Sequence, residues 1–194
     1  MDIILAKSAG FCFGVKRATN MAFKAADQYD RICSHGPIIH SPQMVEKLEA
    51  EGVEVVSDID DISGGAVIIR SHGVASDELG QILDKELDIV DATCPFVKKA
   101  QDFAKLLSDE GYAVVLAGEA EHPEVQGIIS YARNTDVYTV ASLEEAEKLP
   151  RIRKIGVVAQ TTQSYDNFCQ IVEACLSKCQ EIRVFNTICD ATTV

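Results

Sequence analysis

An internal repeat divides this chain into two copies of one unit, each of which begins at a cysteine. Chemically distinctive residues return after a fixed interval of 82 positions, and a fixed interval is the signature of a repeated structural unit. The matched pairs are Cys12 with Cys94, Gly36 with Gly118, and His40 with His122. Two units packed about a common axis would bring their cysteines together. We therefore expect a pseudo-symmetric fold with a metal site at its centre.

The second half of the repeat matches more loosely. The apolar run before His72 resembles the run before Thr161, and the segment that ends at Cys94 resembles the one that ends at Cys189. Cys189 would then open a third unit that is missing from the sequence. The predicted division is a first α/β unit at 1–93, a second α/β unit at 94–188, and the start of a truncated third unit at 189–194.

Apolar runs alternate with amphipathic segments along the chain, which predicts an α/β fold of small parallel sheets flanked by helices. Val67-Ile68-Ile69 is apolar without alternation, as in a parallel strand buried on both faces. Further strands are expected over Met1–Ala6 and at a segment that ends near Ile32. Ser76 and Ser164 are the predicted N-caps of two helices.

Composition restricts the class of protein. The 194 residues are 47% hydrophobic, which allows a proper core, and the net charge of −12 argues against a nucleic acid or an anionic membrane as partner. No signal peptide or membrane span is apparent, so a cytoplasmic protein is expected. The seven cysteines are an odd number, which favours free thiols or metal ligands over a disulfide framework.

Polar side chains collect where strands end, the edge at which open α/β sheets bind ligands. His40, His72 and His122 would together form a pocket for a phosphate group, although ordinary strand-end histidines are an alternative. Glu124 could donate a proton beside such a site, or could simply favour the first turn of a helix. Thr161 could relay a proton or orient a hydroxyl, or could only start a helix.

Three cysteines in equivalent positions suit an iron–sulfur cluster. Fully protein-bound clusters use four ligands, so Cys12, Cys94 and Cys189 would leave one iron open to substrate. The alternative is that all three are buried apolar cysteines. The remaining cysteines are expected to be structural, although Cys175 and Cys179 share a helix face that could hold a metal. The other two are Cys33 and Cys169.

With these residues identified, the chain resembles the 4-hydroxy-3-methylbut-2-enyl diphosphate reductase family, also called LytB, which performs the last step of the non-mevalonate isoprenoid pathway. The matching segments lie in the family's order and extend over nearly the whole chain. They are 9–15 (Ala-Gly-Phe-Cys-Phe-Gly-Val), 36–40 (Gly-Pro-Ile-Ile-His), 70–74 (Arg-Ser-His-Gly-Val), 91–95 (Asp-Ala-Thr-Cys-Pro), 122–125 (His-Pro-Glu-Val), 160–162 (Gln-Thr-Thr) and 186–189 (Asn-Thr-Ile-Cys).

The resemblance implies an oxidoreductase that removes the substrate hydroxyl and yields isopentenyl and dimethylallyl diphosphate. It implies a [4Fe-4S] cluster with an open iron, and an external ferredoxin- or flavodoxin-like electron donor. The implied cluster ligands are Cys12, Cys94 and Cys189. The implied diphosphate-binding residues are His40, His72, His122, Thr161 and Thr162, and the implied catalytic residues are Glu124, Thr161 and His122.

Family members carry a third α/β unit after the third cysteine, and its Ser and Asn residues complete their diphosphate site. We therefore expect this chain to be a truncated fragment that can be inactive by itself. The face on which a third unit would dock is expected to be apolar and exposed, which favours self-association.

Two other classes of protein remain open from the residues alone. A non-catalytic iron–sulfur or metal-binding electron-transfer module would need the cysteines but not Glu124 or the three histidines. A plain α/β ligand-binding domain would stay colourless after anaerobic treatment with iron and sulfide. The absence of a Gly-x-Gly-x-x-Gly motif after the first strand argues against a Rossmann enzyme.

Overall fold

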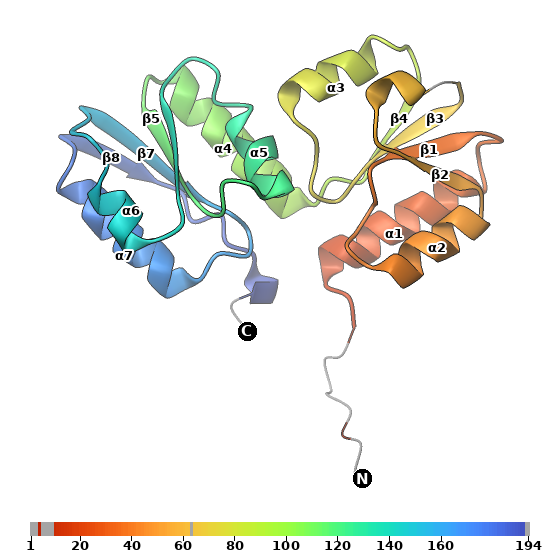
Figure 1. The fold of residues 1–194 in the computed structure, drawn as a ribbon, viewed down its shortest axis with the longest axis horizontal. Helices are drawn as coiled ribbons and strands as arrows, with labels where there is room; N and C mark the ends of the chain where they lie inside the picture. The colour runs from red at the N-terminus through yellow and green to blue at the C-terminus, as the bar shows by residue number, and fades with distance from the viewer. Residues whose placement is uncertain (1–3, 5–9, 63, 193–194) are drawn as a thin grey trace.

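The computed structural model describes residues 4, 10–62 and 64–192 and contains two α/β units side by side (Figure 1). The strand predicted for Met1–Ala6 lies outside the described residues, apart from Ile4. Each unit is built around its own four-stranded sheet. The predicted fold class, small parallel sheets flanked by helices, is confirmed.

The first unit contains four parallel strands in the order β2-β1-β3-β4. Strand β1 is central and pairs with β2 and β3, with Ile32 opposite Val53 on one side and Ala66 on the other. The elements of this unit are α1 (Phe13–Ala26), β1 (Ile32–His35), α2 (Pro42–Ala50), β2 (Val53–Val56), the 3₁₀ turn η1 (Ile59–Asp61), β3 (Ala66–Ile69), α3 (Ser76–Leu83) and β4 (Asp88–Asp91).

The second unit repeats this order with every strand number raised by four, β6-β5-β7-β8, and all of its pairings are parallel. The identical topology confirms the internal repeat that the sequence predicts. The elements are α4 (Pro95–Asp109), β5 (Ala113–Ala117), α5 (Pro123–Ile129), β6 (Val137–Val140), α6 (Leu143–Glu147), β7 (Lys154–Ala159), α7 (Tyr165–Leu176), β8 (Glu181–Val184) and the 3₁₀ turn η2 (Asp190–Thr192).

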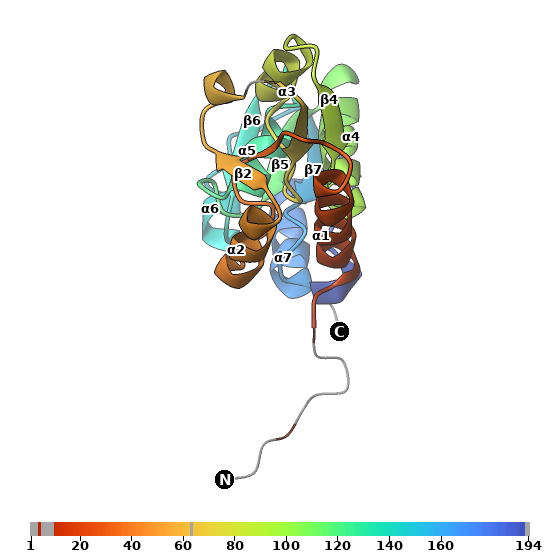
Figure 2. The same ribbon diagram turned by 90° about the vertical axis from the view of Figure 1, so that its right-hand side faces the viewer.

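Each sheet is buried on both faces by helices in equivalent places. In the first unit, α1 and α2 pack on one face, where Ile32 and Ile68 point, and α3 packs on the other with Val67 (Figure 2). In the second unit, α4 and α5 cover Val114 and Leu116, and α6 and α7 cover the opposite face. Burying one such aliphatic side chain contributes about 1.5–3 kcal/mol. Strands β3 and β5 therefore carry continuous apolar runs, because neither of their faces meets water.

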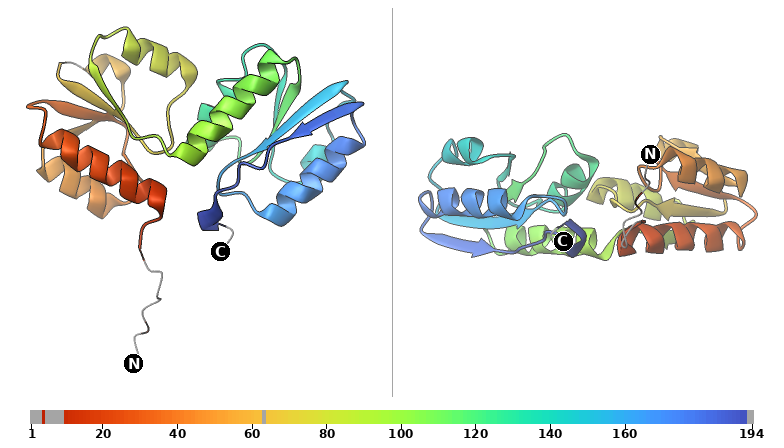
Figure 3. Two further views of the ribbon diagram at one scale, coloured as in Figure 1. Left: turned by 180° about the vertical axis from the view of Figure 1, so that it is seen from behind. Right: turned by 90° about the horizontal axis from the view of Figure 1, so that it is seen from below.

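The connection from β4 through Cys94 to α4 joins the two units. Seen from behind, α4 runs along the boundary between them, and seen from below, α1 and α4 lie in one layer (Figure 3). This arrangement brings the beginnings of α1 and α4 close together, because a β-carbon on Gly14 would lie 2.6 Å from the Cys94 sulfur. The centre of the molecule is therefore formed by helix starts and strand ends.

Some predicted boundaries are wrong. The strand expected to end near Ile32 begins there and ends at His35, because Ser34 and His35 are buried although they are polar. Ser76 is the first residue of α3 and not its N-cap, since the Glu78 carboxylate instead reaches back to the N–H of Ala75 at 2.9 Å. Ser164 does stand at the N-cap of α7, but its side chain makes no capping hydrogen bond.

No helix among the residues that the structure describes is long and apolar enough to cross a membrane. The proposed division at 1–93, 94–188 and 189–194 stays a prediction.

Candidate active site at the junction of the two units

The three cysteines implied as cluster ligands stand at equivalent places in the repeat. Cys12 is the N-cap of α1, Cys94 is the N-cap of α4, and Cys189 directly precedes η2. The backbone N–H of Cys94 donates to Ser71 O at 2.9 Å, and that of Cys189 donates to Thr161 O at 2.8 Å. Each of these two cysteines is thus held by the loop that follows the neighbouring strand. Two helix N-termini also favour negative charge at this point.

The three sulfur-bearing residues line one cavity of about 160 Å³. Its other walls come from the start of α4, from the loops after β3 and β7, and from the first turn of α5. The lining residues are Cys12, Gly14, Val15, Ser71, His72, Cys94, Phe96, Val97, Glu124, Thr161, Thr162, Cys189 and Ala191. The topology therefore gathers residues from positions 12 to 191 around a single point.

The thiols of this cavity influence one another. Burial raises the pKa of the Cys189 thiol above its usual value, and the nearby Cys94 and Cys12 raise it further. Within the described part of the chain, no three His, Cys, Asp or Glu side chains are close enough to hold one metal ion. Three thiols line this cavity, and thiolates are the ligands that hold iron–sulfur clusters.

Three histidines from separate loops meet beside this cavity. The ring centroids of His40 and His72 are 4.4 Å apart, and His122 lies 6.4 Å from His40 and 6.2 Å from His72. They follow β1, β3 and β5, the strands whose carboxyl ends face the junction. The prediction that these three side chains form a compact group agrees with this geometry.

The protein environment strongly lowers the pKa of His72. Burial, together with the neighbouring His40, Arg70 and His122, lowers its pKa from 6.5 to about 4. His72 is consequently neutral at pH 7 in this structure. An anionic group bound among the rings would raise the pKa of His72, because a nearby negative charge favours the protonated imidazole.

Glu124 and Thr161 form a buried pair across the second unit. The N–H and hydroxyl of Thr161 donate to the two carboxylate oxygens of Glu124, at 2.6 and 2.9 Å. Glu124 is only 3% exposed and lines the cysteine cavity. Its own N–H donates to Nδ1 of His122 at 3.1 Å, so Nδ1 is the unprotonated nitrogen and Nε2 carries the hydrogen in neutral His122.

The structure brings most of the predicted site residues together. Thr162 is exposed and lines the cysteine cavity beside Thr161, whereas His40 and His122 lie next to that cavity without lining it. Gly14 is a residue that sequence reasoning did not single out as functional. A glycine in the first turn of a helix, two positions after the cysteine, is the only local signal for it, because its role depends on Cys94 from the other unit.

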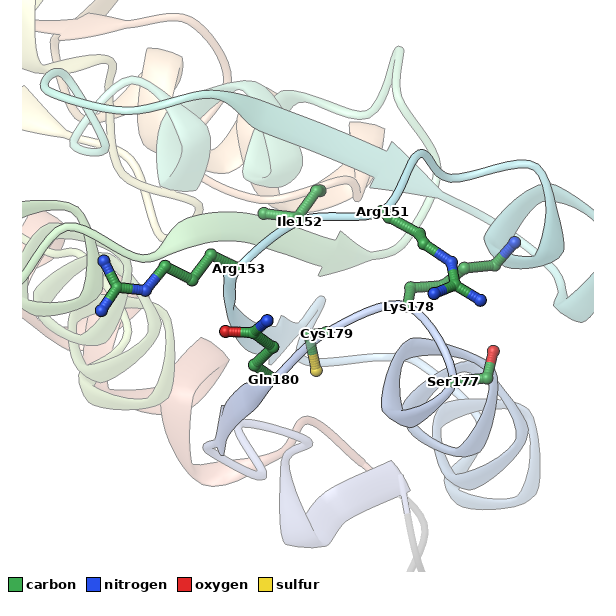
Figure 4. Close-up of a pocket in the computed structure, with 7 residues that line it drawn as sticks. All are labelled: Arg151, Ile152, Arg153, Ser177, Lys178, Cys179 and Gln180. Atoms are coloured by element: carbon green, nitrogen blue, oxygen red, sulfur yellow. The ribbon is translucent and has the colours of Figure 1, made fainter.

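A larger cavity, of about 250 Å³, lies at the opposite edge of the second sheet, where β7 and β8 begin. It contains three cationic side chains, but Arg151 and Arg153 point to opposite sides of it (Figure 4). The Lys178 ammonium is already bonded to the carbonyl of Glu147 at 2.6 Å. Because these cations do not converge, this cavity does not present a cationic cluster to an anion.

Comparison with known proteins identifies relatives of the whole chain. A family profile described as LytB protein matches residues 3–194. A protein of Syntrophotalea carbinolica named 4-hydroxy-3-methylbut-2-enyl diphosphate reductase is 64% identical over 194 residues, which are all of this chain and 70% of the relative. A protein of the same name from Geotalea uraniireducens is 63% identical and is covered over 68% of its length.

Two solved structures have the same fold. One is (E)-4-hydroxy-3-methyl-but-2-enyl diphosphate reductase, the terminal enzyme of the non-mevalonate pathway, with a TM-score of 0.87 and 41% identity over 98% of this chain and 69% of that one. The other is the E-1-hydroxy-2-methyl-but-2-enyl-4-diphosphate reductase from Plasmodium falciparum, with a TM-score of 0.86 and 29% identity over 96% of this chain and 60% of that one.

Proposed function

This chain belongs to the LytB family, and from that premise we propose that it catalyses the reductive dehydroxylation of 4-hydroxy-3-methylbut-2-enyl diphosphate. Two electrons and two protons remove the hydroxyl as water and give isopentenyl or dimethylallyl diphosphate. The observation that carries the proposal is the convergence of three thiols, three histidines and a buried Glu–Thr pair on one junction.

We propose that Cys12, Cys94 and Cys189 hold a [4Fe-4S] cluster. Their shared cavity, the two helix N-termini and the all-thiol donor set support this assignment. When bound, such a cluster supplies electrons and an open iron that acts as a Lewis acid toward the substrate hydroxyl.

His40, His72 and His122 are proposed to bind the diphosphate. Hydrogen at Nε2 of neutral His122 provides a donor, and protonation of the other rings on binding would supply positive charge to a group that carries several negative charges. The buried position of His72 strengthens each such interaction, because the local dielectric constant is low.

Glu124 is proposed to supply the proton for the departing water. Two hydrogen bonds from Thr161 fix the orientation of its carboxyl group toward the cysteine cavity, and burial keeps bulk water from competing. Thr161 positions this group, and Thr162 contributes a hydroxyl to the same wall.

We propose that the two electrons of each turnover come from outside the chain. A ferredoxin- or flavodoxin-like protein is the proposed donor. The seven cysteines are all free thiols, which supports a reducing compartment such as the cytoplasm as the place of action.

The test is anaerobic reconstitution with iron and sulfide, followed by an iron count. About four irons per chain and a broad visible band are expected for the unaltered protein. The Cys12→Ser, Cys94→Ser and Cys189→Ser variants should each lose most of the iron, whereas Cys169→Ser, at an exposed thiol on α7, should retain it. Equal iron in all four variants would disprove the cluster assignment. Turnover of the allylic diphosphate by the reconstituted protein then tests the activity.

A further inference from the structure

The loop after β3 carries His72 into the site, and its backbone hydrogen bonds leave two of its carbonyl oxygens without a partner among the described residues. Ser71 N donates to Ile38 O at 3.1 Å, and Ser76 N donates to the Ser130 hydroxyl at 2.9 Å. Between these points, no hydrogen bond within the described residues reaches the carbonyl oxygens of His72 and Val74. The part of the loop that presents the imidazole therefore has two acceptors to satisfy.

Gln101 is buried directly behind this loop. It lies two turns into α4, the helix that begins after Cys94, and only 2% of it is exposed. Its Nε2 is fully buried and, among the described residues, has no hydrogen-bond partner. Buried amide groups of this kind are normally paired, because an unpaired one costs about 1–3 kcal/mol of desolvation free energy.

Glycines on both sides define where this amide lies. A β-carbon on Gly73 would stand 2.7 Å from Gln101 Nε2, so the loop backbone lies against the amide. The position of a β-carbon on Gly127, in α5, is 3.7 Å from Nε2, 3.7 Å from His72 O and 3.8 Å from Val74 O. The amide nitrogen and the two carbonyl oxygens thus all lie within 3.8 Å of the position that a side chain on residue 127 would occupy, and glycine leaves this side open.

We propose that Gln101 is a positioning residue for the histidine site, and that one buried water beside Gly127 links its amide to the carbonyls of His72 and Val74. The hydrogen-bonding capacity matches, because a water can accept from Nε2 and donate to both oxygens. The helix that starts at Cys94 thereby sets the position of His72. The effect on diphosphate binding rests on the proposed function, whereas the water bridge itself does not.

Two substitutions remove this bridge in different ways. Gln101→Met keeps the length of the side chain and removes the donor. Gly127→Ala places a methyl group beside the three polar atoms, where 3.7–3.8 Å is ordinary contact, so the fold has room for it. Alanine also has a higher helix propensity than glycine. Gly127→Ala can therefore still test the proposal if Gln101→Met folds poorly. Lys105→Met, at an exposed position one turn further along α4, is the control.

The measurements are a high-resolution crystal structure, the ring-proton NMR signal of His72, and the affinity for inorganic pyrophosphate. A water within hydrogen-bond distance of all three atoms is expected in the unaltered protein. Both variants should shift the His72 signal and weaken pyrophosphate binding roughly fivefold, the size of one lost hydrogen bond, while Lys105→Met changes neither. The double variant should be no worse than either single one, because both remove the same bridge.

Absence of the water at high resolution would overturn the proposal, and so would an unchanged His72 signal in both variants. Fully additive effects of the two substitutions would also overturn it. If the unaltered protein does not bind pyrophosphate, the diphosphate part of the proposed function fails, but the water and the His72 signal still decide whether Gln101 positions the loop.

Discussion

A substitution at Glu124 can remove the proposed proton donor while the fold is kept. In Glu124→Gln, the amide oxygen still accepts from Thr161 N, and the hydroxyl of Thr161 can rotate to accept from the new NH₂ group. The fold and the iron content should therefore persist. Turnover should fall about 10²-fold or more, because the amide has no proton to give. Steady-state kinetics on iron-matched samples checks this, with the exposed Glu144→Gln as control. Full activity in Glu124→Gln would show that Glu124 does not supply the proton.

The lowered pKa of His72 predicts how the stability of the fold depends on pH. Its folded pKa is about 4, below the ordinary value of 6.5, so the unfolded chain binds a proton between these values that the folded chain does not. The free energy of unfolding is therefore unaffected by the titration of His72 above pH 6.5. It decreases as the pH falls from 6.5 toward 4, by at most about 3 kcal/mol. Urea unfolding of the iron-free protein at pH 7 and pH 5 should show this fall. His72→Gln should reduce it, and an equal fall in that variant would contradict the prediction.

At the scale of the element, two helical glycines predict opposite results for the same substitution. In α3, a β-carbon on Gly80 would meet open space, so Gly80→Ala should stabilise the fold by about 1 kcal/mol. In α1, a β-carbon on Gly14 would lie 2.6 Å from the Cys94 sulfur. Gly14→Ala should therefore displace that thiol and lower iron incorporation, whatever it does to the helix. Iron counts and thermal unfolding of both variants measure the contrast. Full iron in Gly14→Ala would show that the sulfur can move aside.

The elements also show how far the sequence can predict the fold. Val67-Ile68-Ile69 lies in β3 as expected, because a continuous apolar run indicates a strand that is buried on both faces. The strand at Ile32–His35 escapes this kind of prediction, because half of its residues are polar although the whole strand is buried. Periodicity detects apolar burial and cannot detect a buried Ser or His.

The candidate site is predictable where the repeat marks it. Cys12 and Cys94, and His40 and His122, stand out because they recur at one interval, and the structure places them around one junction. Gln101 carries no such signal. Its surroundings come from Gly73 in one unit and Gly127 in the other, which no local pattern relates.

At the scale of the whole molecule, an apolar groove predicts self-association. Tyr165, Leu176 and Val184 are 53%, 56% and 39% exposed, and they line a groove of about 400 Å³ between α7 and the edge strand β8. The curated relatives extend beyond the matched part, since this chain spans about 70% of their length. An exposed apolar face of this kind favours pairing between two copies. We therefore expect the 194-residue chain to form dimers or larger species as its concentration rises.

Light scattering coupled to gel filtration tests this expectation, with Leu176→Glu as the decisive variant. A carboxylate at this half-exposed position costs little in the monomer, but it would have to be desolvated if a second copy covered the groove. The variant should shift the protein toward monomer without lowering the thermal midpoint. Lys148→Glu, which makes a larger change of charge outside the groove, should not. If the unaltered chain is a monomer at every concentration, the exposed groove does not cause self-association. If Lys148→Glu has the same effect as Leu176→Glu, the association depends on net charge and not on the groove.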